Sequence, residues 1–600
     1  MAQNLFTDFP DRIEQLKKYC ELSKLAFPLE ESFGEKNFFK SPEEAMEFYY
    51  GVLEELGKLA GTVIRPQAEA VDRIGAHLKE GEVILPAPLE ENIKRLLELG
   101  VFSGLASRAN NGFNLPQSIQ AMALEILAHA CPNTALTVAA YSMVPFVETW
   151  GTEEQKTRIL PKLLSLEWKT SMALTEPSAG SDLGQLRTSA KRVGDQYIVN
   201  GNKIFITSGS GDVTFALART DATSKGLQGL SVLIIPRKIG EKDNYRVTRI
   251  EEKVCLHASP TCEIVFENST GELLGPEGEG FKVMLDLMND ARLAMAALAT
   301  GIACASLEEA KNYAKQRITM GKPIFQHPMV ADMIYEMEME ISAMRALVNE
   351  GAMSFDLMRV AKKQGDDKAF KKWRKRYRRL TPLCKYYCCE KAITISRNAV
   401  QLFGGYGVCK DYPVERLLRE TIIYPIYEGT SQIQSLMVLK DTLKDVAVNA
   451  TGFLGSLAGA WAEAKITRDP IKANVLKARN ELNLAIKSIL MSILKDKFKS
   501  DIDSLKHSNI QQFLKDFSLN LLTAKTDLTY PFLVAERLAR ITSDYYALKS
   551  LSDHLPAGDT ARRELILNFA ELVLPRMRME NEYMIHRLPS TIDYMKRQSV

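Results

Sequence analysis

The spacing of hydrophobic positions changes along the chain and divides it into regions. From about residue 46 to 165, apolar residues recur every three or four positions, as in EAMEFYYGVLEELGKLAGTVI and PQSIQAMALEILAHA. This spacing places the apolar side chains on one face of a helix and therefore predicts a helical region over 46–168. The first 45 residues have a mixed pattern, and we expect them to form an N-terminal extension.

A strand pattern replaces the helical one between about residues 169 and 283. The stretches YIVNGNKIFITSG, VTFALART, LSVLIIP and CEIVFEN are rich in β-branched and aromatic residues, and Gly, Asn and Asp punctuate them. Helical spacing returns over 284–445 and, after a predicted linker around Val446–Gly452, continues over 452–600. The expected order of domains is helical, β, helical, helical.

Composition limits the class of protein. Six hundred residues exceed one ordinary core, so we expect several domains. Hydrophobic residues make up 46% and charged residues 25%, as in folded globular proteins, and the net charge of +3 indicates no particular partner. We find no apolar run of membrane-spanning length, and the opening MAQNLFTDFPDRIEQLKKYC lacks the apolar core of a signal peptide, so export is not expected.

The cysteines and histidines do not form a recognisable redox or metal motif. Nine cysteines occur without a CxxC pair, and Cys388 and Cys389 are adjacent. We interpret them as reduced, mostly structural thiols in the cytoplasm or in an equivalent reducing matrix compartment. The seven histidines are scattered without a ligand-like cluster, so we predict no metal site.

Two segments of the predicted β domain have the chemistry to hold a ligand. In the stretch Met172–Gly184, Pro177 and Gly180 predict a turn whose small residues let backbone N–H groups approach a phosphate or a heteroaromatic edge. In NGNKIFITSG, alternation after the Asn-Gly turn puts Phe205 and Thr207 on one face, which suits a flat ring. Taken singly, a polar turn and an ordinary buried strand are the simpler interpretations.

The stretch YPIYEGTSQIQ contains one carboxylate, Glu428, directly before Gly429 and Thr430. Its neighbours are otherwise apolar or carry hydroxyl groups. One interpretation is a carboxylate at the positive end of a helix that begins here. The other is a catalytic base.

Taken in order, these segments resemble the acyl-CoA dehydrogenase family over about residues 46–445. The motifs that carry the resemblance are ALTEPSAGSD, NGNKIFITSG, MNDAR at 288–292, RITMGKPI at 317–324, QLFGGYG at 401–407 and YEGTSQIQ at 427–434. The stretch RIGAHLKEGEVILP and the additional helical C-terminus look like the larger subgroup, which handles long-chain acyl-CoAs or methylthiopropanoyl-CoA. The resemblance implies an α+β fold with an N-terminal helical domain, a central β-barrel, a four-helix bundle that carries the catalytic base, and an additional C-terminal helical domain.

The resemblance also implies FAD and assigns site residues. The residues implied to contact the flavin and its ribityl-phosphate are Met172, Leu174, Thr175, Gly180 and Ser181. Those implied beside the ring are Phe205, where many members carry Trp, Ile206 and Thr207, and those implied at the phosphates or adenosine are Thr430 and Gln432. Those implied to reach the FAD of a second subunit in a homodimer or homotetramer are Arg317, Gln401, Leu402, Gly404 and Gly405. Those implied along the acyl-CoA path are Ser181, Asn289, Arg292, Tyr427 and Gly429.

The implied reaction is the α,β-dehydrogenation of an acyl-CoA to a trans-2-enoyl-CoA, as in β-oxidation, with Glu428 as base and an electron-transfer flavoprotein as acceptor. Three alternatives stay open: an acyl-CoA oxidase that uses oxygen, a nucleic-acid-binding flavoprotein without dehydrogenation, and a protein whose flavin only supports folding. The chain departs from the family pattern at Lys253-Val254-Cys255, at Met320 and at Pro328. None of these departures removes the base or the flavin loop.

A basic run over 359–379, RVAKKQGDDKAFKKWRKRYRR, contains eleven Lys and Arg residues. Contact with nucleic acid or with an anionic membrane surface is one interpretation, and a solvated helical excursion is the simpler one. We expect the run to lie too far from the substrate tunnel to bind the phosphates of CoA.

Overall fold

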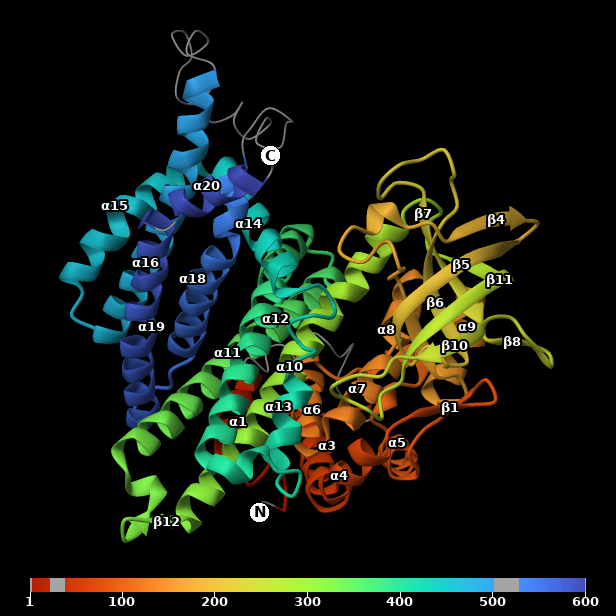
Figure 1. The fold of residues 1–600 in the computed structure, drawn as a ribbon, viewed down its shortest axis with the longest axis horizontal. Helices are drawn as coiled ribbons and strands as arrows, with labels where there is room; N and C mark the ends of the chain where they lie inside the picture. Colours follow the sequence, from red (N-terminus) through yellow and green to blue (C-terminus); the bar gives the residue numbers. More distant parts are fainter. Residues whose placement is uncertain (1–2, 22–37, 501–527, 587, 599–600) are drawn as a thin grey trace.

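The computed structural model describes residues 3–21, 38–500, 528–586 and 588–598, and the following account concerns these residues (Figure 1). Three blocks stand side by side in this view. The sheet lies on the right, a bundle of long helices occupies the centre, and the C-terminal helices lie on the left. The predicted α+β class and the order of helical and β regions are confirmed.

The N-terminal block consists of helices packed beside the bundle. They are α1 (Pro10–Glu21), α3 (Pro42–Leu59), α4 (Arg65–Ile74), α5 (Ala87–Glu98), α6 (Gln117–Ala130), α7 (Pro132–Tyr141), α8 (Val144–Trp150) and α9 (Glu153–Leu164). A π-helical turn, Ala60–Ile64, joins α3 to α4, and a small hairpin of β1 (His77–Lys79) and β2 (Glu82–Ile84) follows α4. Helix α1 packs on α6 and α11, so the described part of the predicted N-terminal extension belongs to the helical core.

The β block is a sheet that closes on itself. Its strands are β3 (Thr170–Ala173), β4 (Ser189–Val193), β5 (Gln196–Thr207), β6 (Val213–Arg219), β7 (Leu230–Pro236), β10 (Arg246–Ile250) and β11 (Thr261–Leu274). They pair in the order β10-β11-β5-β4-β6-β3, and β7 pairs with both β6 and β11, so the β5, β4, β6, β7 and β11 pairings form a ring. The predicted barrel is therefore confirmed. A separate hairpin of β8 (Lys238–Ile239) and β9 (Lys242–Asp243) projects from it.

The central bundle is built on three long helices, α10 (Gly280–Gln316), α11 (Pro328–Lys363) and α12 (Asp367–Phe403), which pack against one another. The β12 (Ile318–Thr319) and β13 (Lys322–Pro323) hairpin connects α10 to α11, and α13 (Pro413–Thr421) and α14 (Ser431–Val448) follow α12. Glycine allows α6 and α10 to approach closely, because a Cβ at Gly301 would stand 2.3 Å from the carbonyl oxygen of Glu125.

One described helix, α10, is long and apolar enough to cross a membrane by length and composition. The sequence pattern had indicated no run of that length. In the structure 78% of its most apolar stretch is buried against the other helices, because α10 is the central helix of the bundle.

The C-terminal helices α15 (Ala450–Ile466), α16 (Pro470–Ser500), α18 (Thr529–Asp553), α19 (Thr560–His586) and α20 (Leu588–Gln598) form the third block. The linker predicted at 446–452 is reduced to one residue, Asn449, whose side chain accepts a hydrogen bond of 3.1 Å from the Gly452 N–H and so caps α15. The linker is this short because α14 continues to Val448 and α15 begins at Ala450. The domain boundaries inferred from the sequence stay a prediction.

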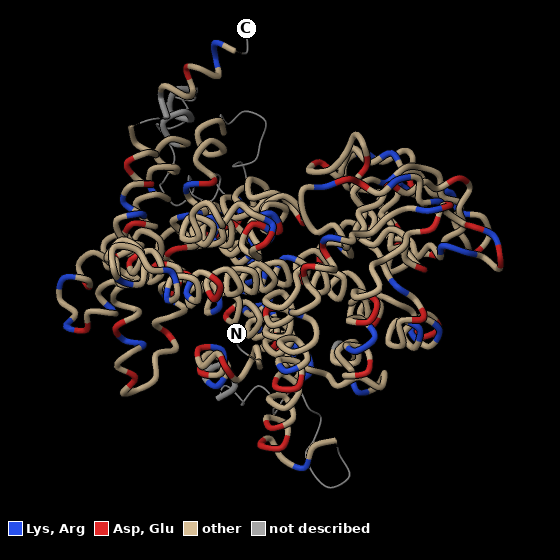
Figure 2. Tube along the Cα trace, turned by 60° about the horizontal axis from the view of Figure 1, so that its bottom comes forward, with Lys and Arg blue, Asp and Glu red and all other residues tan. Residues whose placement is uncertain are grey.

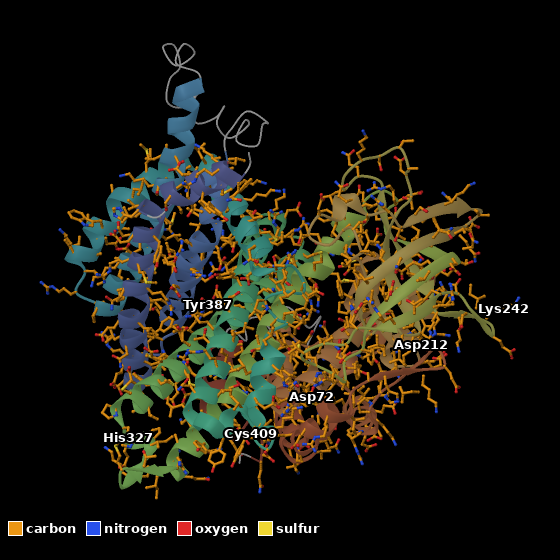
Figure 3. The ribbon with its side chains drawn as sticks, in the orientation of Figure 1. Asp72, Asp212, Lys242, His327, Tyr387 and Cys409 are labelled. Carbon is orange, nitrogen blue, oxygen red and sulfur yellow. The ribbon has the colours of Figure 1, made fainter. Side chains whose placement is uncertain are left out.

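Glu340 of α11 fastens the C-terminal block to the bundle. Its carboxylate accepts hydrogen bonds from Tyr387 (2.5 Å) and Lys391 (2.7 Å) of α12 and from Arg576 (2.7 Å) of α19. Figure 3 labels Tyr387 within this helical half of the molecule. Burial alone would raise the pKa of Glu340. The charges of Lys391 and Arg576 outweigh this effect and lower the pKa to about 2, so the carboxylate stays ionised.

A second buried carboxylate, Glu125 of α6, joins the N-terminal helices to the bundle. It accepts from Arg12 Nε of α1 at 2.9 Å and from Arg345 Nη2 of α11 at 2.7 Å. Burial alone would raise the pKa of Glu125, but Arg345 and Arg12 outweigh it and lower the pKa from 4.5 to about 2. A buried carboxylate between two guanidinium groups is costly to lose, because its removal leaves unpaired positive charge.

We predict that Glu125→Gln lowers the free energy of unfolding by about 3–5 kcal/mol, the usual cost of breaking a buried ion pair from one side. The depressed pKa of Glu125 gives stability that is complete above pH 4.5 and is lost as the pH falls towards 2. The variant should therefore lose less stability than the native chain across that interval. Urea unfolding at several pH values measures both effects, with Glu14→Gln on the exposed face of α1 as control; equal stability of the two variants contradicts the prediction.

Candidate active site

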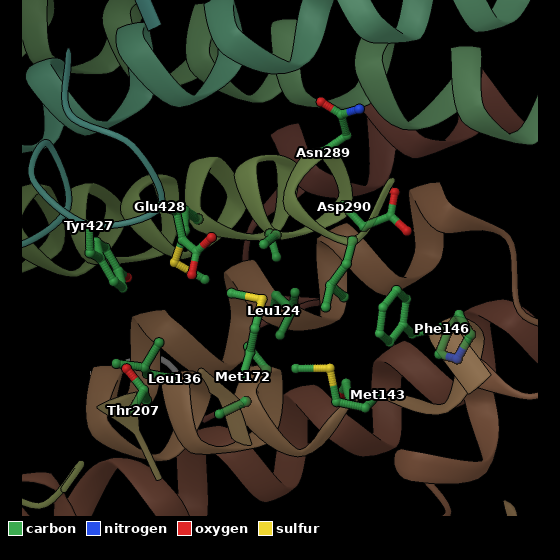
Figure 4. Close-up of a pocket in the computed structure, with 18 of the residues that line it drawn as sticks. Leu124, Leu136, Met143, Phe146, Met172, Thr207, Asn289, Asp290, Tyr427 and Glu428 are labelled. Carbon is green, nitrogen blue, oxygen red and sulfur yellow. The ribbon is translucent and has the colours of Figure 1, made fainter. Parts of the chain in front are cut away.

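A cavity of about 1670 Å³ lies where the β block, the N-terminal helices and the bundle meet (Figure 4). Its walls combine apolar side chains of α6, α7 and α10 with the ends of β3 and β5 and with the loop before α14. The predicted site residues on its wall are Met172, Leu174, Thr175, Gly180, Ser181, Phe205, Ile206, Thr207, Asn289, Tyr427, Glu428, Gly429 and Thr430. Segments far apart in the sequence thus converge on one space.

Glu428 stands in the loop between α13 and α14, and Figure 4 shows its carboxylate pointing into the cavity. Its backbone is left-handed, with φ of 55°, and Gly429 follows with φ of 89°. A non-glycine residue in this conformation costs about 1–2 kcal/mol and persists only where its surroundings hold it. Strained residues of this kind are frequent at functional sites, although this chain also has them elsewhere.

Two buried side chains hold this loop. Lys385 Nζ donates to the carbonyl oxygen of Gly429 at 2.8 Å, and Gln434 Nε2 donates to the carbonyl oxygens of Gly429 and Glu428 at 2.9 and 3.1 Å. The φ of 89° at position 429 favours glycine, and a Cβ there would lie 2.7 Å from Gln434 Nε2 and displace that side chain. Lys385 and Gln434 were absent from the sequence-based site: Lys385 lies outside the quoted motifs, whereas Gln434 closes the motif YEGTSQIQ but was given no role.

The helix that follows is capped by Thr430 rather than by Glu428. The Thr430 hydroxyl accepts from the Ile433 N–H at 3.3 Å, and α14 begins at Ser431. Because the cap is already supplied, the helix-end interpretation leaves the carboxylate of Glu428 without a role. The direction of its side chain favours the second interpretation, a group that acts on a ligand in the cavity.

Electrostatics prepare Glu428 for proton transfer. Burial raises its pKa, and the nearby charges of Arg292 and Lys385 offset part of this rise. The pKa of Glu428 is thus set by two opposing effects, the loss of solvent and the positive charges nearby. A carboxylate with a raised pKa is a stronger base than an ordinary glutamate once it is ionised.

Arg292 occupies a different place from the one implied by the resemblance. It is buried in α10, does not line the cavity, and donates from Nη1 to Asn289 Oδ1 at 2.9 Å. Thr381 also donates to this Asn289 oxygen at 3.4 Å, and Figure 4 shows Asn289 pointing away from the labelled apolar residues. A guanidinium in this position acts on Glu428 through its charge and has no path to a phosphate.

A buried ion pair shapes the turn that begins at Thr175. Lys203 Nζ of β5 contacts Glu176 Oε1 and the carbonyl oxygen of Leu174, each at 2.8 Å. The Glu176 carboxylate also accepts from the backbone N–H groups of Arg187 and Thr188. Burial lowers the pKa of Lys203 to about 8, and Glu176 opposes that fall. The sequence analysis missed both members of this pair, although each stands inside a quoted motif.

Phe205 and Thr207 both line the cavity, in line with their predicted shared face. Phe205 is 58% exposed and has a positive φ of 60°, and the register between β11 and β5 shifts nearby. An apolar ring left this open beside a cavity is available for contact with a ligand.

Some predicted site residues lie elsewhere in this chain. Besides Arg292, those that do not line the cavity are Arg317, Gln401, Leu402, Gly404, Gly405 and Gln432. Figure 3 labels His327 and Cys409 at the lower end of the bundle, and most of these residues lie within ten positions of one or the other in the sequence. Gln432 Nε2 instead donates to Glu536 Oε2 of α18 at 3.4 Å.

The basic run over 359–379 is closer to the site than expected. Side chains from the end of α11 and the start of α12 line the same cavity as Glu428: Arg359, Lys362, Lys363, Arg374 and Arg378. The expectation that this run lies too far from the tunnel is therefore wrong. The cause is the packing of α11 and α12 along α10, which no local pattern reveals.

Asp290 is a further cavity residue that the sequence analysis did not single out. Tyr377 of α12 donates a hydrogen bond of 2.6 Å to its Oδ1, and Figure 4 shows its carboxylate directed towards the cavity. Burial raises the pKa of Asp290 to about 7, with the Tyr377 hydrogen bond opposing the rise. It stands inside the quoted motif MNDAR, between Asn289 and Arg292, and that position is the signal that could have indicated it.

Comparison with known proteins agrees with this geometry. Three models of the acyl-CoA dehydrogenase family match consecutive parts of the chain, the N-terminal domain at 51–167, the middle domain at 171–269 and the C-terminal domain at 278–443. The 3-methylmercaptopropionyl-CoA dehydrogenase of Ruegeria pomeroyi is 31% identical over 435 residues, which cover 68% of this chain and 73% of that protein.

Two solved structures extend the comparison. An acyl-CoA dehydrogenase of Bacillus anthracis complexed with FAD has a TM-score of 0.73 at 20% identity, covering 93% of this chain and 91% of that one, which shows the shared fold. A chain in a structure described by the electron transferring flavoprotein of Acidaminococcus fermentans has a TM-score of 0.58 at 30% identity, covering 66% of this chain and 98% of that one. The chain therefore belongs to the acyl-CoA dehydrogenase family and is an FAD-dependent oxidoreductase that acts on acyl-CoA.

Proposed function

We propose that this enzyme removes the α- and β-hydrogens of an acyl-CoA thioester to give a trans-2-enoyl-CoA, with Glu428 as the catalytic base. The observation that carries the proposal is the Glu428 carboxylate, which points into the shared cavity from a strained loop and has a pKa raised by burial. The α-proton of a thioester is weakly acidic, so its removal needs a base with these properties.

The cavity wall suits FAD. At Gly180 an added Cβ would meet only the Thr175 methyl group, at 3.5 Å, so the turn has an open surface towards a ligand. The groups proposed to hold the cofactor are Met172, Leu174, Thr175, Gly180, Ser181, Phe205, Ile206, Thr207 and Thr430. FAD supplies the hydride acceptor when bound.

The protein's own groups perform the proton chemistry. Glu428 takes the α-proton on its carboxylate, and Arg292 and Lys385 limit how far burial raises its pKa. The backbone N–H of Glu428 has no acceptor among the described residues, so it is available to donate to the thioester oxygen. A donor at that oxygen stabilises the enolate-like charge that develops as the proton leaves. Apolar residues around the base exclude water and strengthen both interactions.

We further propose an electron-transfer flavoprotein as the acceptor. The 30% identity to a chain in a structure described by an electron transferring flavoprotein supports this partner. Formation of hydrogen peroxide in place of reduction of that partner would favour the acyl-CoA oxidase alternative. We also propose a homo-oligomer in which Arg317, Gln401, Leu402, Gly404 and Gly405, remote from this chain's own cavity, reach the FAD of a second subunit.

The cavity extends from Glu428 towards an apolar end between the N-terminal helices. Its lining there includes Val52, Leu56, Val101, Leu115 and Ile119. An apolar space of this extent fits a long acyl chain, whose burial contributes about 0.8 kcal/mol per CH₂ group. We therefore propose long-chain acyl-CoAs as substrates, with the sulfur-containing substrate named for the Ruegeria relative as the alternative.

We predict that Glu428→Gln retains FAD but lowers turnover by about 10³-fold, since a positioned base contributes 10²–10⁴ in rate. The visible spectrum of the purified variant reports its FAD, and reduction of an artificial acceptor by acyl-CoA reports turnover. Glu241→Gln, on an exposed turn between β8 and β9, is the matched control. Near-native turnover in Glu428→Gln would refute the assignment of the base.

A pH profile tests the charge next to the base. Glu428 must be ionised to act, so kcat/KM should fall as the pH drops through its raised pKa. We predict that Arg292→Gln moves this acid limb to higher pH, because the positive charge that lowers the pKa of Glu428 is lost. Arg292→Lys keeps a charge and should restore much of the native profile. If the acid limb of the kcat/KM profile stays in place or moves to lower pH in Arg292→Gln, Arg292 does not lower the pKa of Glu428.

Chain-length preference tests the apolar end. Ala123 of α6 lines the cavity, and Ala123→Trp should narrow it. We predict that kcat/KM for the longest acyl-CoAs falls at least about tenfold while that for the shortest changes little, since overpacking acts where the chain must pass. A panel from short to long acyl-CoAs, including branched and sulfur-containing ones, measures this. Ala123→Ser is the control, and a uniform loss across the panel contradicts the proposed path.

A further inference from the structure

The wall of the cavity also has a cationic part. Arg359, Lys362 and Lys363 stand on one face of α11, three to four residues apart, directly after Phe355 and Met358 on the same face. Arg374 and Arg378 stand likewise on one face of α12, alongside Phe370 and Tyr377. The lining face of α11 therefore changes from apolar to positively charged side chains, and that of α12 interleaves the two kinds.

Part of this positive charge forms no ion pair with the described residues. Arg378 Nη2 pairs with Asp441 Oδ1 at 3.0 Å, and Arg359 donates to the Asn114 side chain. Lys362 and Arg374 are exposed, and the described residues hold no ion pair with either. Asp286 of α10 lies within electrostatic reach of both: burial raises its pKa, and Arg374, Lys282 and Lys362 oppose the rise.

Helix α10 connects this cationic part to the base. Arg292 lies within electrostatic reach of Glu428, and Asp286 lies within reach of Lys362 and Arg374. The two positions are about two helical turns apart on one helix. A ligand with a reacting end at Glu428 and a charged end at Lys362 and Arg374 would follow the cavity wall along α10.

We propose that Lys362 and Arg374, with Lys363 and Arg359 beside them, bind the phosphate groups of the CoA part of the substrate. This inference rests on the proposed function, because it takes the thioester end of the same ligand to be at Glu428. Arg and Lys bind phosphate oxygens through charge-assisted hydrogen bonds, and exposed positive charge also speeds the approach of an anionic ligand.

Several other cations of the basic run are paired with acids, which makes the run a poorer surface for nucleic acid or an anionic membrane. Lys375 and Arg379 pair with Asp445, and Arg376 pairs with Glu350. Figure 2 shows positive and negative residues interspersed over the trace of the molecule. Nucleic-acid recognition needs a continuous, unpaired positive surface, whereas a few charges in a cavity wall suit a small phosphate-bearing ligand.

The test compares three ligands: CoA, dephospho-CoA, which lacks only the 3′-phosphate, and pantetheine, which lacks all the phosphates together with the adenosine. Binding to the FAD-loaded enzyme is measured by calorimetry at two salt concentrations, without any turnover. We expect Lys362→Gln/Arg374→Gln to weaken CoA binding about tenfold, to reduce its salt dependence, and to leave pantetheine binding unchanged. Lys371→Gln, an exposed residue of the same run that does not line the cavity, is the control and should bind CoA normally.

Two outcomes overturn the inference: CoA binding that is unaffected in the double variant, or equal losses for CoA and pantetheine. Retention of bound FAD and of the unfolding midpoint shows that the double variant is folded, and Lys362→Gln alone provides a second variant with a smaller expected loss. The proposed function fails separately, if the native enzyme binds CoA in this manner but no acyl-CoA reduces its flavin.

Discussion

A buried carboxylate in a strained loop is the constraint on which the site depends. Glu428 is left-handed, and hydrogen bonds from Lys385 and Gln434 to the carbonyl groups of the loop hold it in that conformation. The same arrangement directs the carboxylate into the cavity and brings it near Arg292. Geometry and basicity thus come from one set of buried contacts, and loss of any of them would disturb both.

The N-terminal helices, the bundle and the β domain must meet accurately for this loop to face the β domain. Asp72 of α4 accepts from Arg419 of α13 at 3.2 Å, and Asn133 of α7 donates to Glu420 of α13 at 2.9 Å. Asn133 also accepts from the Ala258 N–H at 3.0 Å, which ties in the loop before β11. Figure 3 places Asp72 where the N-terminal helices adjoin the bundle. These buried polar contacts fix α13, and α13 leads directly into the Glu428 loop.

The sequence was informative where chemistry is local. Hydrophobic spacing predicted the order of helical and β regions, and the motif around Glu428 identified a carboxylate that the structure directs into the cavity. It failed where residues meet only through packing. Arg292 was expected on the substrate path but is buried behind the base, and the basic run was expected to be remote but reaches the cavity. Spacing along one helix cannot reveal which neighbouring helix covers it, so such placements require the fold.

The most direct measurement is an anaerobic titration of the purified yellow enzyme with acyl-CoAs of increasing length, followed by flavin absorbance. If Glu428 removes the α-proton while hydride leaves the β-carbon, at least one acyl-CoA should bleach the oxidised flavin band in proportion to the amount added, and a trans-2-enoyl-CoA should be formed. A flavin that stays oxidised with every acyl-CoA in the series would contradict this account of the site.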